Sequence, residues 1–270
     1  DLALDWAARE GWNPGLHDAT PFHSADADGF LLGLVDGKSV SLISAVRYGQ
    51  DFGFVGFYIV HPDWRGRGLG WAIWQQAMAR LAGRNIALDG VLAEQDNYRR
   101  SGFNLAWRNV RHEGRTRMSS STATTDITLC RLTDQTLECV ARYDRGFFPA
   151  DRSAFLAAWI GQPGSHALGL LRDGRLVASG VIRPCRTGYK IGPLFADDAN
   201  LAERLFSELQ CQVPTDAPLF LDVPECNAEA VALARRHGMQ PCFETARMYT
   251  GPVPDISLPR TFGITSFELG

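Results

Sequence analysis

The pattern of apolar and polar positions in the first half of the chain predicts a sheet that leads into an amphipathic helix. Residues 54–60 are apolar at almost every position, which is typical of a strand buried on both faces. After a glycine-rich loop, apolar residues recur in steps of three and four over 69–82, which predicts a helix with one buried face. Asp36-Gly37 stands between two apolar segments and predicts a hairpin turn. Further elements are predicted as helices over 2–10 and 96–101 and as strands over 29–35, 39–47, 86–92 and 105–111.

The second half of the chain repeats the plan of the first. The sequence around Asp36-Gly37 reappears around Asp173-Gly174, and that of 99–103 reappears at 235–239 with nearly the same offset. A small, polar run, 119–125, separates the two copies and is typical of a linker. Two copies indicate a duplication and not a solenoid.

We therefore expect two tandem domains, residues 1–115 and 126–270, joined by a linker over 116–125. The fold class expected is α/β, in the sense of mixed α+β sheets. Each domain would hold a mixed, mostly antiparallel sheet flanked by helices.

Composition excludes several classes of partner. Hydrophobic residues make up 45% and charged residues 21% of the 270 positions, with a net charge of −3. This globular balance, without a basic run, argues against nucleic acid and against a membrane surface. No secretion signal is visible, so we expect a cytoplasmic protein with reduced, mostly buried cysteines. The six cysteines and six histidines are scattered, which predicts no metal site.

The glycine-rich loop before the predicted helix has the properties of an anion site. Gly66, Gly68 and Gly70 lack Cβ atoms, so their backbone can approach a ligand closely. The helix that follows offers free N–H groups, and Arg65 and Arg67 add positive charge. Together these features predict binding of a phosphate or pyrophosphate.

A dinucleotide is one alternative ligand, since Asp89 follows the loop at about the distance expected for a ribose-binding acid. Two features disfavour it. The Gly68-Leu69-Gly70 spacing does not fit the dinucleotide pattern, and Pro62 with its neighbours separates the strand from the first glycine. The pattern of a P-loop is absent as well.

Three motifs follow one another in the first half. Tyr58-Ile59-Val60-His61-Pro62 ends the apolar strand, Arg65-x-x-Gly68-x-Gly70 forms the loop, and Tyr98-x-x-x-Gly102-Phe103 comes later. These motifs and the order of elements over 1–115 resemble the GNAT superfamily of acyl-CoA-dependent N-acetyltransferases. The family's first strand is the one element without a counterpart after Asp1.

The resemblance implies a role for each motif. The backbone of Tyr58, Ile59 and Val60 would pair with the pantetheine arm of acetyl-CoA. Tyr98 would protonate the departing thiolate, and the acceptor would approach from the loop at 12–15. The pyrophosphate would be bound by the residues of the loop and of the first helical turn, namely Arg65, Gly66, Arg67, Gly68, Leu69, Gly70 and Trp71.

The general base has no clear candidate, because the apolar strand contains no acid. Asp51, Asp89, Glu94 and Asp96 are candidates by neighbourhood. Deprotonation through an ordered water, or of an amine that is already neutral, would require no base from the protein.

The second copy has lost the loop. Its aligned residues, 202–207, contain no glycine, and Asp197-Asp198 would repel a pyrophosphate. We therefore expect a degenerate GNAT-like domain without a coenzyme site, and one coenzyme A per chain. A predicted strand over 262–269 could cover the sheet edge of the first half.

These observations predict an N-acyltransferase that moves an acetyl group from acetyl-CoA to an amine, most naturally on a small molecule. The alternative is a non-catalytic acyl-CoA sensor, which the missing strand acid favours and Tyr98 disfavours. A homodimer is a possible assembly of such a chain.

Overall fold

The computed structural model describes residues 1–117 and 126–270. Its helices are α1 (Leu2–Arg9), α2 (Ala19–Ala25), α3 (Leu69–Arg80), α4 (Gln95–Arg100), α5 (Leu137–Asp144), α6 (Ser153–Ile160), α7 (Ala199–Gln210) and α8 (Ala228–Arg236). Its strands are β1 (Phe30–Val35), β2 (Lys38–Tyr48), β3 (Phe52–Val60), β4 (Asn85–Val91), β5 (Asn104–Arg115), β6 (Ile127–Arg131), β7 (His166–Arg172), β8 (Arg175–Pro184), β9 (Tyr189–Ala196), β10 (Pro218–Pro224), β11 (Gln240–Tyr249) and β12 (Thr261–Gly263).

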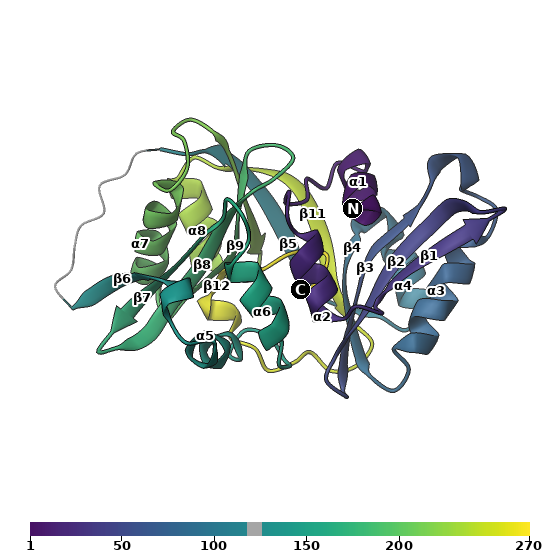
Figure 1. The fold of residues 1–270 in the computed structure, drawn as a ribbon, viewed down its shortest axis with the longest axis horizontal. Coiled ribbons are helices and arrows are strands. Elements are labelled where there is room, and N and C mark those ends of the chain that lie inside the picture. Colours follow the sequence, from purple (N-terminus) through teal and green to yellow (C-terminus); the bar gives the residue numbers. More distant parts are fainter. Residues whose placement is uncertain (118–125) are drawn as a thin grey trace.

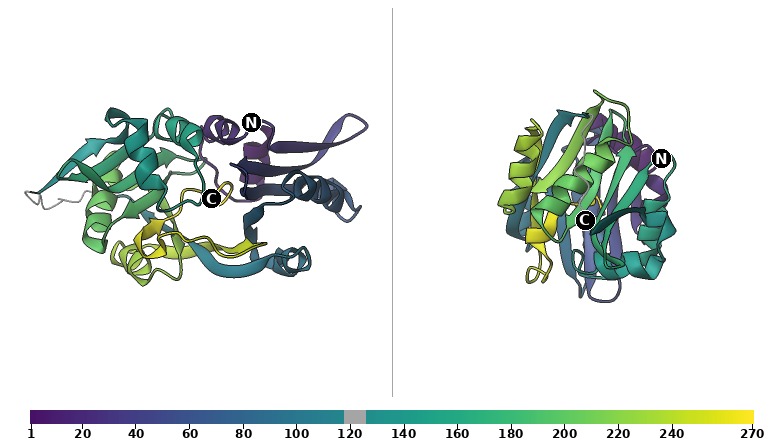
Figure 2. Two further views of the ribbon diagram at one scale, coloured as in Figure 1. Left: turned by 90° about the horizontal axis from the view of Figure 1, so that it is seen from below. Right: turned by 90° about the vertical axis from the view of Figure 1, so that its left-hand side faces the viewer.

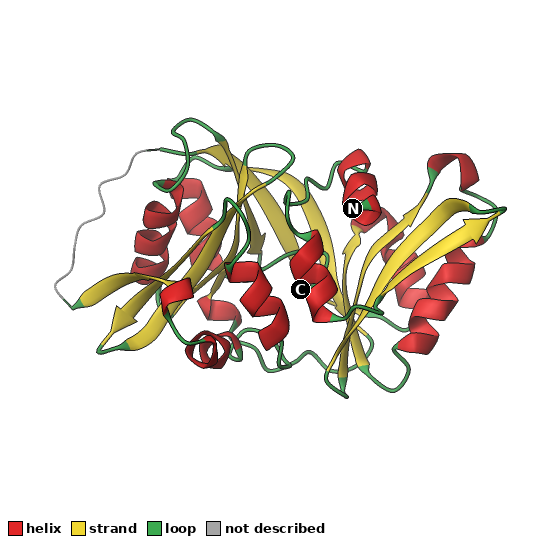
Figure 3. Ribbon diagram, in the orientation of Figure 1, coloured by secondary structure: helices red, strands yellow, loops and turns green. Residues whose placement is uncertain are grey.

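The described strands form one sheet that runs through both halves of the molecule (Figure 1). Their order is β1-β2-β3-β4-β11-β5-β10-β9-β8-β7-β6, and β12 pairs with β9 outside this path. The pairs β3–β4 and β9–β10 are parallel, and the other pairs are antiparallel. The expected mixed, mostly antiparallel sheets flanked by helices are confirmed (Figure 3).

The two halves exchange a strand at the centre of this sheet. β11 comes from the second half but pairs with β4 of the first, and β5 comes from the first half but pairs with β10 of the second. β5 and β11 also pair with each other and run between the two lobes (Figure 1). Each half therefore completes the sheet of the other, which the sequence did not indicate.

The conformation of matching turns confirms the internal repeat. Asp36 and Gly37 both have positive φ angles, +49° and +75°, and so do Asp173 and Gly174, at +51° and +72°. Positive φ at both central residues is the geometry of the tight hairpin turn that Asp-Gly favours. The same turn thus joins β1 to β2 and β7 to β8.

Three apolar clusters hold the helices to the sheet. In the first, α3 covers the face of the first-half strands that bears Ile43 and Val55, and in the second α7 and α8 cover β8, β9 and β10 in the same way. The third cluster lies between the halves, where α1, α2, α5 and α6 bury Trp6, Phe22 and Trp159. The apolar run at 54–60 therefore faces helices on both sides, as predicted.

The C-terminal segment differs from its prediction. A strand forms only over Thr261–Gly263 and pairs with β9, not with an edge strand of the first half. The residues after it run between the two lobes, where the C-terminus lies (Figure 2, left). The edge strand β1 instead presents Leu32 and Leu34 to solvent.

The described residues add three smaller findings. No group of three or more His, Cys, Asp or Glu residues in them could hold a metal ion, and none of their helices is long and apolar enough to cross a membrane. The six cysteines form no disulfide. Only Cys185 is buried, whereas Cys226 and Cys242 are exposed, so the expectation of mostly buried cysteines is wrong.

Candidate functional site

The candidate site lies where β3 and β4 part from each other. The two strands pair from Phe52–Asn85 to Val55–Leu88, and β3 then continues to Val60. Along residues 56–60, no strand of the described chain pairs with this edge of β3. An extended ligand could therefore form strand-like hydrogen bonds with its free backbone groups.

A β-bulge at Phe57 redirects the side chains of β3 at this point. Phe57 has a φ angle of +48°, and the pairing of β3 with β2 shifts its register beside it. Val55 and Tyr58 therefore both face α3, where the Tyr58 ring lies 5.3 Å from the ring of Trp74. Phe57 faces the central cluster, with its ring 5.6 Å from that of Phe22.

A cavity of about 430 Å³ fills the space between the diverging strands. On the side of α3 and α4 it is lined by Tyr58, Trp74 and Tyr98. From the exchanged strand β11 and the C-terminal segment it is lined by Phe243, Thr245, Phe267 and Glu268. The second half thus supplies part of the wall of a site that the motifs place in the first half.

The N-terminus of α3 opens beside this cavity and has no side-chain cap. Gly68 is its N-cap residue with a φ angle of +78°, and Gly66 before it has +74°. The bond from Ala72 N–H to the Gly68 carbonyl is the first of the helix, so the N–H groups of 69–71 have no helical partner. A Cβ added at Gly66 or Gly68 would meet no atom within 4 Å, so the loop faces open space. This geometry fits an anion such as a pyrophosphate.

The other residues of the loop surround this helix end. Gly70 lies so close to the Tyr58 hydroxyl that an added Cβ would sit 2.8 Å from it. Trp71 is 57% exposed, and Arg67 is exposed with its guanidinium 4.8 Å from the Trp64 ring centroid. Leu69 is half-buried. Arg67 and Trp71 are therefore free to meet a ligand.

Arg65 has protein partners of its own. Its Nε donates to the carbonyl of Val60 at 3.0 Å, and its guanidinium forms an ion pair with Glu10. These contacts fasten the loop to the end of β3 and to the C-terminal end of α1. Arg65 also lines the cavity, so it adds positive charge there as well as holding the loop in position.

Tyr98 lies in the cavity wall, where the sequence placed it. Its ring packs over Gly90 so closely that a Cβ there would sit 2.3 Å from the ring, and it lies 5.6 Å from the ring of Trp74. Only 7% of the residue is exposed. Burial, with Glu94 nearby, raises the pKa of the Tyr98 hydroxyl above its ordinary value. The hydroxyl therefore keeps its proton at neutral pH and can donate it.

The structure separates the four acids considered as bases. Asp51 and Asp96 are exposed outside the cavity, and Asp96 pairs with Arg99. Asp89 and Glu94 line the cavity. Glu94 accepts a hydrogen bond from Asn97.

Asp89 is committed to structure. Its carboxylate accepts two hydrogen bonds from Arg247 of the exchanged strand, at 3.0 and 2.5 Å, and one from Asn109 at 2.8 Å. The side chain is fully buried. These bonds occupy the oxygens that a ribose would require, which removes the support for a dinucleotide.

Glu268 is an acid of the cavity wall that the sequence did not indicate. It is 4% exposed and belongs to the C-terminal segment. The available signal was weak, since Glu268 is the one charged residue in 261–270 and no motif surrounds it.

The matching place in the second half is filled by the chain itself. β9 and β10 pair as far as Ile191 and Leu221, and β12 then lies against both strands. Its Thr261 pairs with Phe195 on β9, and the N–H of Ile264 donates to the carbonyl of Asp222 on β10. Backbone hydrogen bonds that a pantetheine arm would need are already made there.

The helix end in the second half is occupied too. Asp198 is the N-cap of α7, and its side chain accepts from the N–H of Leu201 at 2.9 Å. Asp197 accepts from the Tyr143 hydroxyl and pairs with Arg260. Both acids therefore have structural roles, and the absence of a second coenzyme site stays a prediction.

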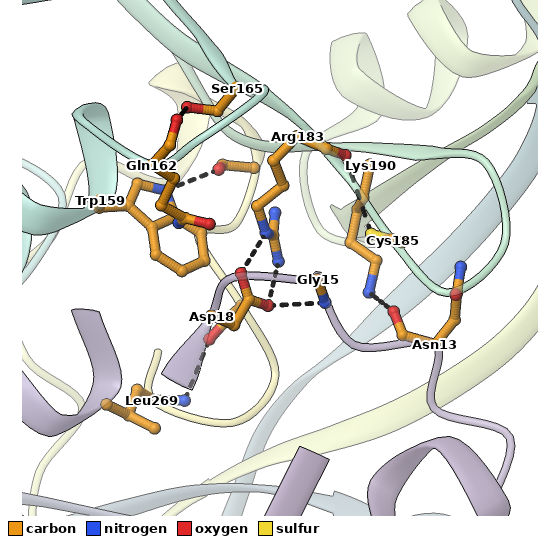
Figure 4. A network of polar contacts seen from close by, with 12 residues as sticks. Asn13, Gly15, Asp18, Trp159, Gln162, Ser165, Arg183, Cys185, Lys190 and Leu269 are labelled. Atoms are coloured by element: carbon orange, nitrogen blue, oxygen red, sulfur yellow. Dashed lines mark hydrogen bonds and ion pairs between the residues drawn. The ribbon is translucent and has the colours of Figure 1, made fainter. Parts of the chain in front are cut away.

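A buried polar network joins the halves beside the cavity (Figure 4). Asp18, just before α2, accepts from Arg183 of β8 at 2.9 Å and from the N–H of Gly15 at 2.8 Å. Lys190 of β9 donates to the carbonyl of Asn13 at 2.9 Å. The loop at 12–15, where the acceptor was expected, is thus held in place by the second half.

Comparisons with known proteins agree with this geometry. Residues 2–103 match the acetyltransferase (GNAT) family, and residues 140–263 match an acetyltransferase (GNAT) domain. Holothin acyltransferase from Pseudoalteromonas sp. (strain SANK 73390) is 28% identical over 269 residues, which is 100% of this chain and 90% of that protein.

Two solved structures share the fold. A putative acetyltransferase from Pyrococcus horikoshii superposes with a TM-score of 0.76 at 20% identity, over 93% of this chain and 83% of that one. A tandem GNAT protein from the clavulanic acid biosynthesis pathway superposes with 0.64 at 14% identity, over 93% and 94%. With a GNAT match in each half, the chain belongs to the GNAT family as a tandem acyltransferase.

Proposed function

We propose that the protein transfers an acetyl group from acetyl-CoA to the amino group of a small molecule, with one catalytic site in the first half. The observation that carries the proposal is the cavity between β3 and β4, which is lined by Tyr98 and by Arg65 of the loop that leads to the uncapped end of α3. Acetyl-CoA supplies the activated acyl group as a thioester.

Binding of the coenzyme falls to backbone groups. The free edge of β3 at Tyr58, Ile59 and Val60 would accept the pantetheine arm, and the N–H groups of 69–71 would hold the pyrophosphate. Backbone N–H groups on this edge would also stabilise the oxygen that gains negative charge when the amine attacks. The Tyr98 hydroxyl would give its proton to the departing sulfur.

An amine acceptor is supported by the charge of the cavity wall. Of the lining carboxylates, Glu10 and Asp89 pair with Arg65 and Arg247, whereas Glu94 and Glu268 form no ion pair among the described residues. A cationic amine would be drawn to such a surface. Flat apolar walls from Trp12, Phe243 and Phe267 favour a small organic molecule over a peptide. One relative is named holothin acyltransferase, so holothin is one acceptor to test.

The test is release of free thiol from acetyl-CoA in the presence of a panel of amines. The panel holds a primary alkylamine, benzylamine, aniline and holothin, and the acylated product is identified by mass spectrometry. We expect amine-dependent thiol release. Binding of acetyl-CoA, shown by a raised melting temperature, without transfer to any amine would instead indicate a non-catalytic sensor.

A further inference from the structure

The C-terminal segment brings Glu268, an acid of the second half, to the wall of the cavity. After β12, the chain crosses to the first half, where the backbone carbonyl of Glu268 lies against Gly56 of β3. A Cβ at Gly56 would sit 2.1 Å from that oxygen, so glycine is required for the contact. The Tyr48 hydroxyl donates to the next carbonyl, that of Leu269, at 3.2 Å. These contacts fix the backbone on either side of the Glu268 side chain.

The Glu268 carboxylate is buried without a complete set of partners. Its Oε1 has no hydrogen-bond partner in the structure, although the residue is only 4% exposed. A buried acceptor without a partner costs about 1–3 kcal/mol, so its retention calls for an explanation. Oε1 itself is not accessible from the cavity that Glu268 lines, so a rotation of the side chain would bring it to a hydrogen-bond donor of a ligand there.

The other carboxylates of the cavity all have partners. Asp89 accepts from Arg247 and Asn109, Glu10 pairs with Arg65, and Glu94 accepts from Asn97. A base must be able to accept a proton from the substrate, and a carboxylate already bound to a guanidinium is poorly suited to it. Among the lining acids, Glu268 is the one with a buried oxygen that has no hydrogen-bond partner.

We propose that Glu268 is the catalytic base that accepts the proton from the acceptor amine, so that the second half supplies the acid missing from β3. This inference rests on the proposed function of the same site. The carbon–nitrogen bond forms and the carbon–sulfur bond breaks. One proton moves from the nitrogen to Glu268 and one from the Tyr98 hydroxyl to the thiolate. Exchange with water then restores both side chains.

The surroundings of Glu268 make its carboxylate a stronger base than that of an exposed glutamate. Burial raises the pKa of its carboxyl above the ordinary value, and Asp18 adds to the shift. The cations Lys190 on β9, Arg111 on β5 and Arg183 on β8 act in the opposite direction. A carboxylate with a raised pKa binds a proton more strongly, and catalysis by Glu268 should increase as pH rises through that pKa.

The experiment compares the full-length wild type with Glu268→Gln, Glu268→Asp and Glu229→Gln. The last replaces an exposed acid in the first turn of α8 and serves as the matched control. Each protein is assayed with acetyl-CoA and aniline, and with the best amine of the panel. Aniline is neutral across pH 6–9, so a change of rate over that range reports a group on the enzyme and not the nucleophile.

We expect Glu268→Gln to lower kcat by about 10²–10⁴-fold and to lose the rise of activity with pH that the wild type shows. Acetyl-CoA binding should stay unchanged, Glu268→Asp should retain part of the activity, and Glu229→Gln should match the wild type. A Glu268→Gln enzyme that keeps its rate or its pH profile would overturn this inference while leaving the transferase in place. A wild type that acylates no amine would overturn the proposed function itself.

Discussion

Tyr98 is positioned to donate a proton, although burial makes its hydroxyl a weaker acid than that of an exposed tyrosine. Burial raises the pKa of its hydroxyl, so the proton is retained throughout the neutral range, and the ring is fixed between Gly90 and Trp74. Tyr98→Phe keeps the packing and removes the donor. We expect kcat to fall by about 10²–10⁴-fold with the affinity for acetyl-CoA little changed, as measured by thiol release and by calorimetry. Wild-type turnover would assign Tyr98 to packing alone.

Removing one partner of the buried ion pair between Asp18 and Arg183 should destabilise the protein far more than breaking an exposed pair across the same two halves. Both side chains are fully buried, and the Arg183 guanidinium also lies 4.3 Å from the Trp159 ring centroid. Asp18→Asn leaves a buried cation without its counter-ion, which costs about 3–5 kcal/mol. We expect that loss in the free energy of unfolding from urea titration.

The matched control for this prediction is Asp5→Asn. Asp5 pairs with Arg186, and this pair also joins the two halves, but the side chains are 50% and 45% exposed. Exposed pairs contribute about 0–1 kcal/mol. An equal loss of unfolding free energy in the two variants would show that burial does not determine the cost of breaking the Asp18 pair.

The residues predicted from the sequence are those that a local motif contains. Gly68 and Tyr98 stand in short patterns with fixed spacing, and the structure places Gly68 at the uncapped end of α3 and Tyr98 in the cavity wall. Glu268 has no such pattern around it. Its position depends on where the last residues of the chain pack, and neighbouring residues do not determine that.

At the scale of secondary-structure elements, the N-terminal end of α3 offers the most direct test of coenzyme binding. Gly68→Val would place a β-branched residue at a φ angle of +78°, which costs about 1–2 kcal/mol and distorts the end of the helix. The added side chain would also fill the open space beside the loop, where the pyrophosphate is expected. We expect acetyl-CoA binding to be lost in isothermal titration.

Gly37→Val is the matched control for this substitution. Gly37 has a φ angle of +75° and equally open space around it, but it lies in the turn between β1 and β2 and is not part of the loop. The stability cost should be similar, and acetyl-CoA binding should be retained. Loss of binding in both variants would attribute the effect to strain and not to the loop.

The bounds of individual helices and strands could be predicted closely where one clear pattern of apolar residues covers the whole element. The helix expected over 69–82 is observed as Leu69–Arg80, and the strand expected over 54–60 as Phe52–Val60. The strand expected over 262–269 ends at Gly263. An apolar segment that fills the space between two lobes has the composition of a strand, yet it need not have strand neighbours.

At the scale of the whole molecule, the exchange of β5 and β11 could not be predicted from the sequence. Alternation of apolar residues predicts that a segment is a strand and does not say which strand lies beside it. Both segments follow a helix that ends in a positive-φ glycine, Gly102 or Gly238, so each would have suited its own half equally well. Their positions depend on contacts between residues more than a hundred positions apart.

Because of the exchanged strands, each half needs the other to complete its sheet, as the subunits of an obligate dimer do. Residues 1–117 alone would lack β11 between β4 and β5, and residues 126–270 alone would lack β5 beside β10, which leaves unpaired strand edges on both pieces. We expect each piece to aggregate when expressed alone. Expressed together as separate chains, they should form a one-to-one complex that binds acetyl-CoA, as size-exclusion chromatography and calorimetry would show. The peptide link between the halves would then only ensure that one copy of each half is made and that the two stay at a high effective concentration. This is the arrangement expected if a dimer of single domains with swapped strands was fused into one polypeptide.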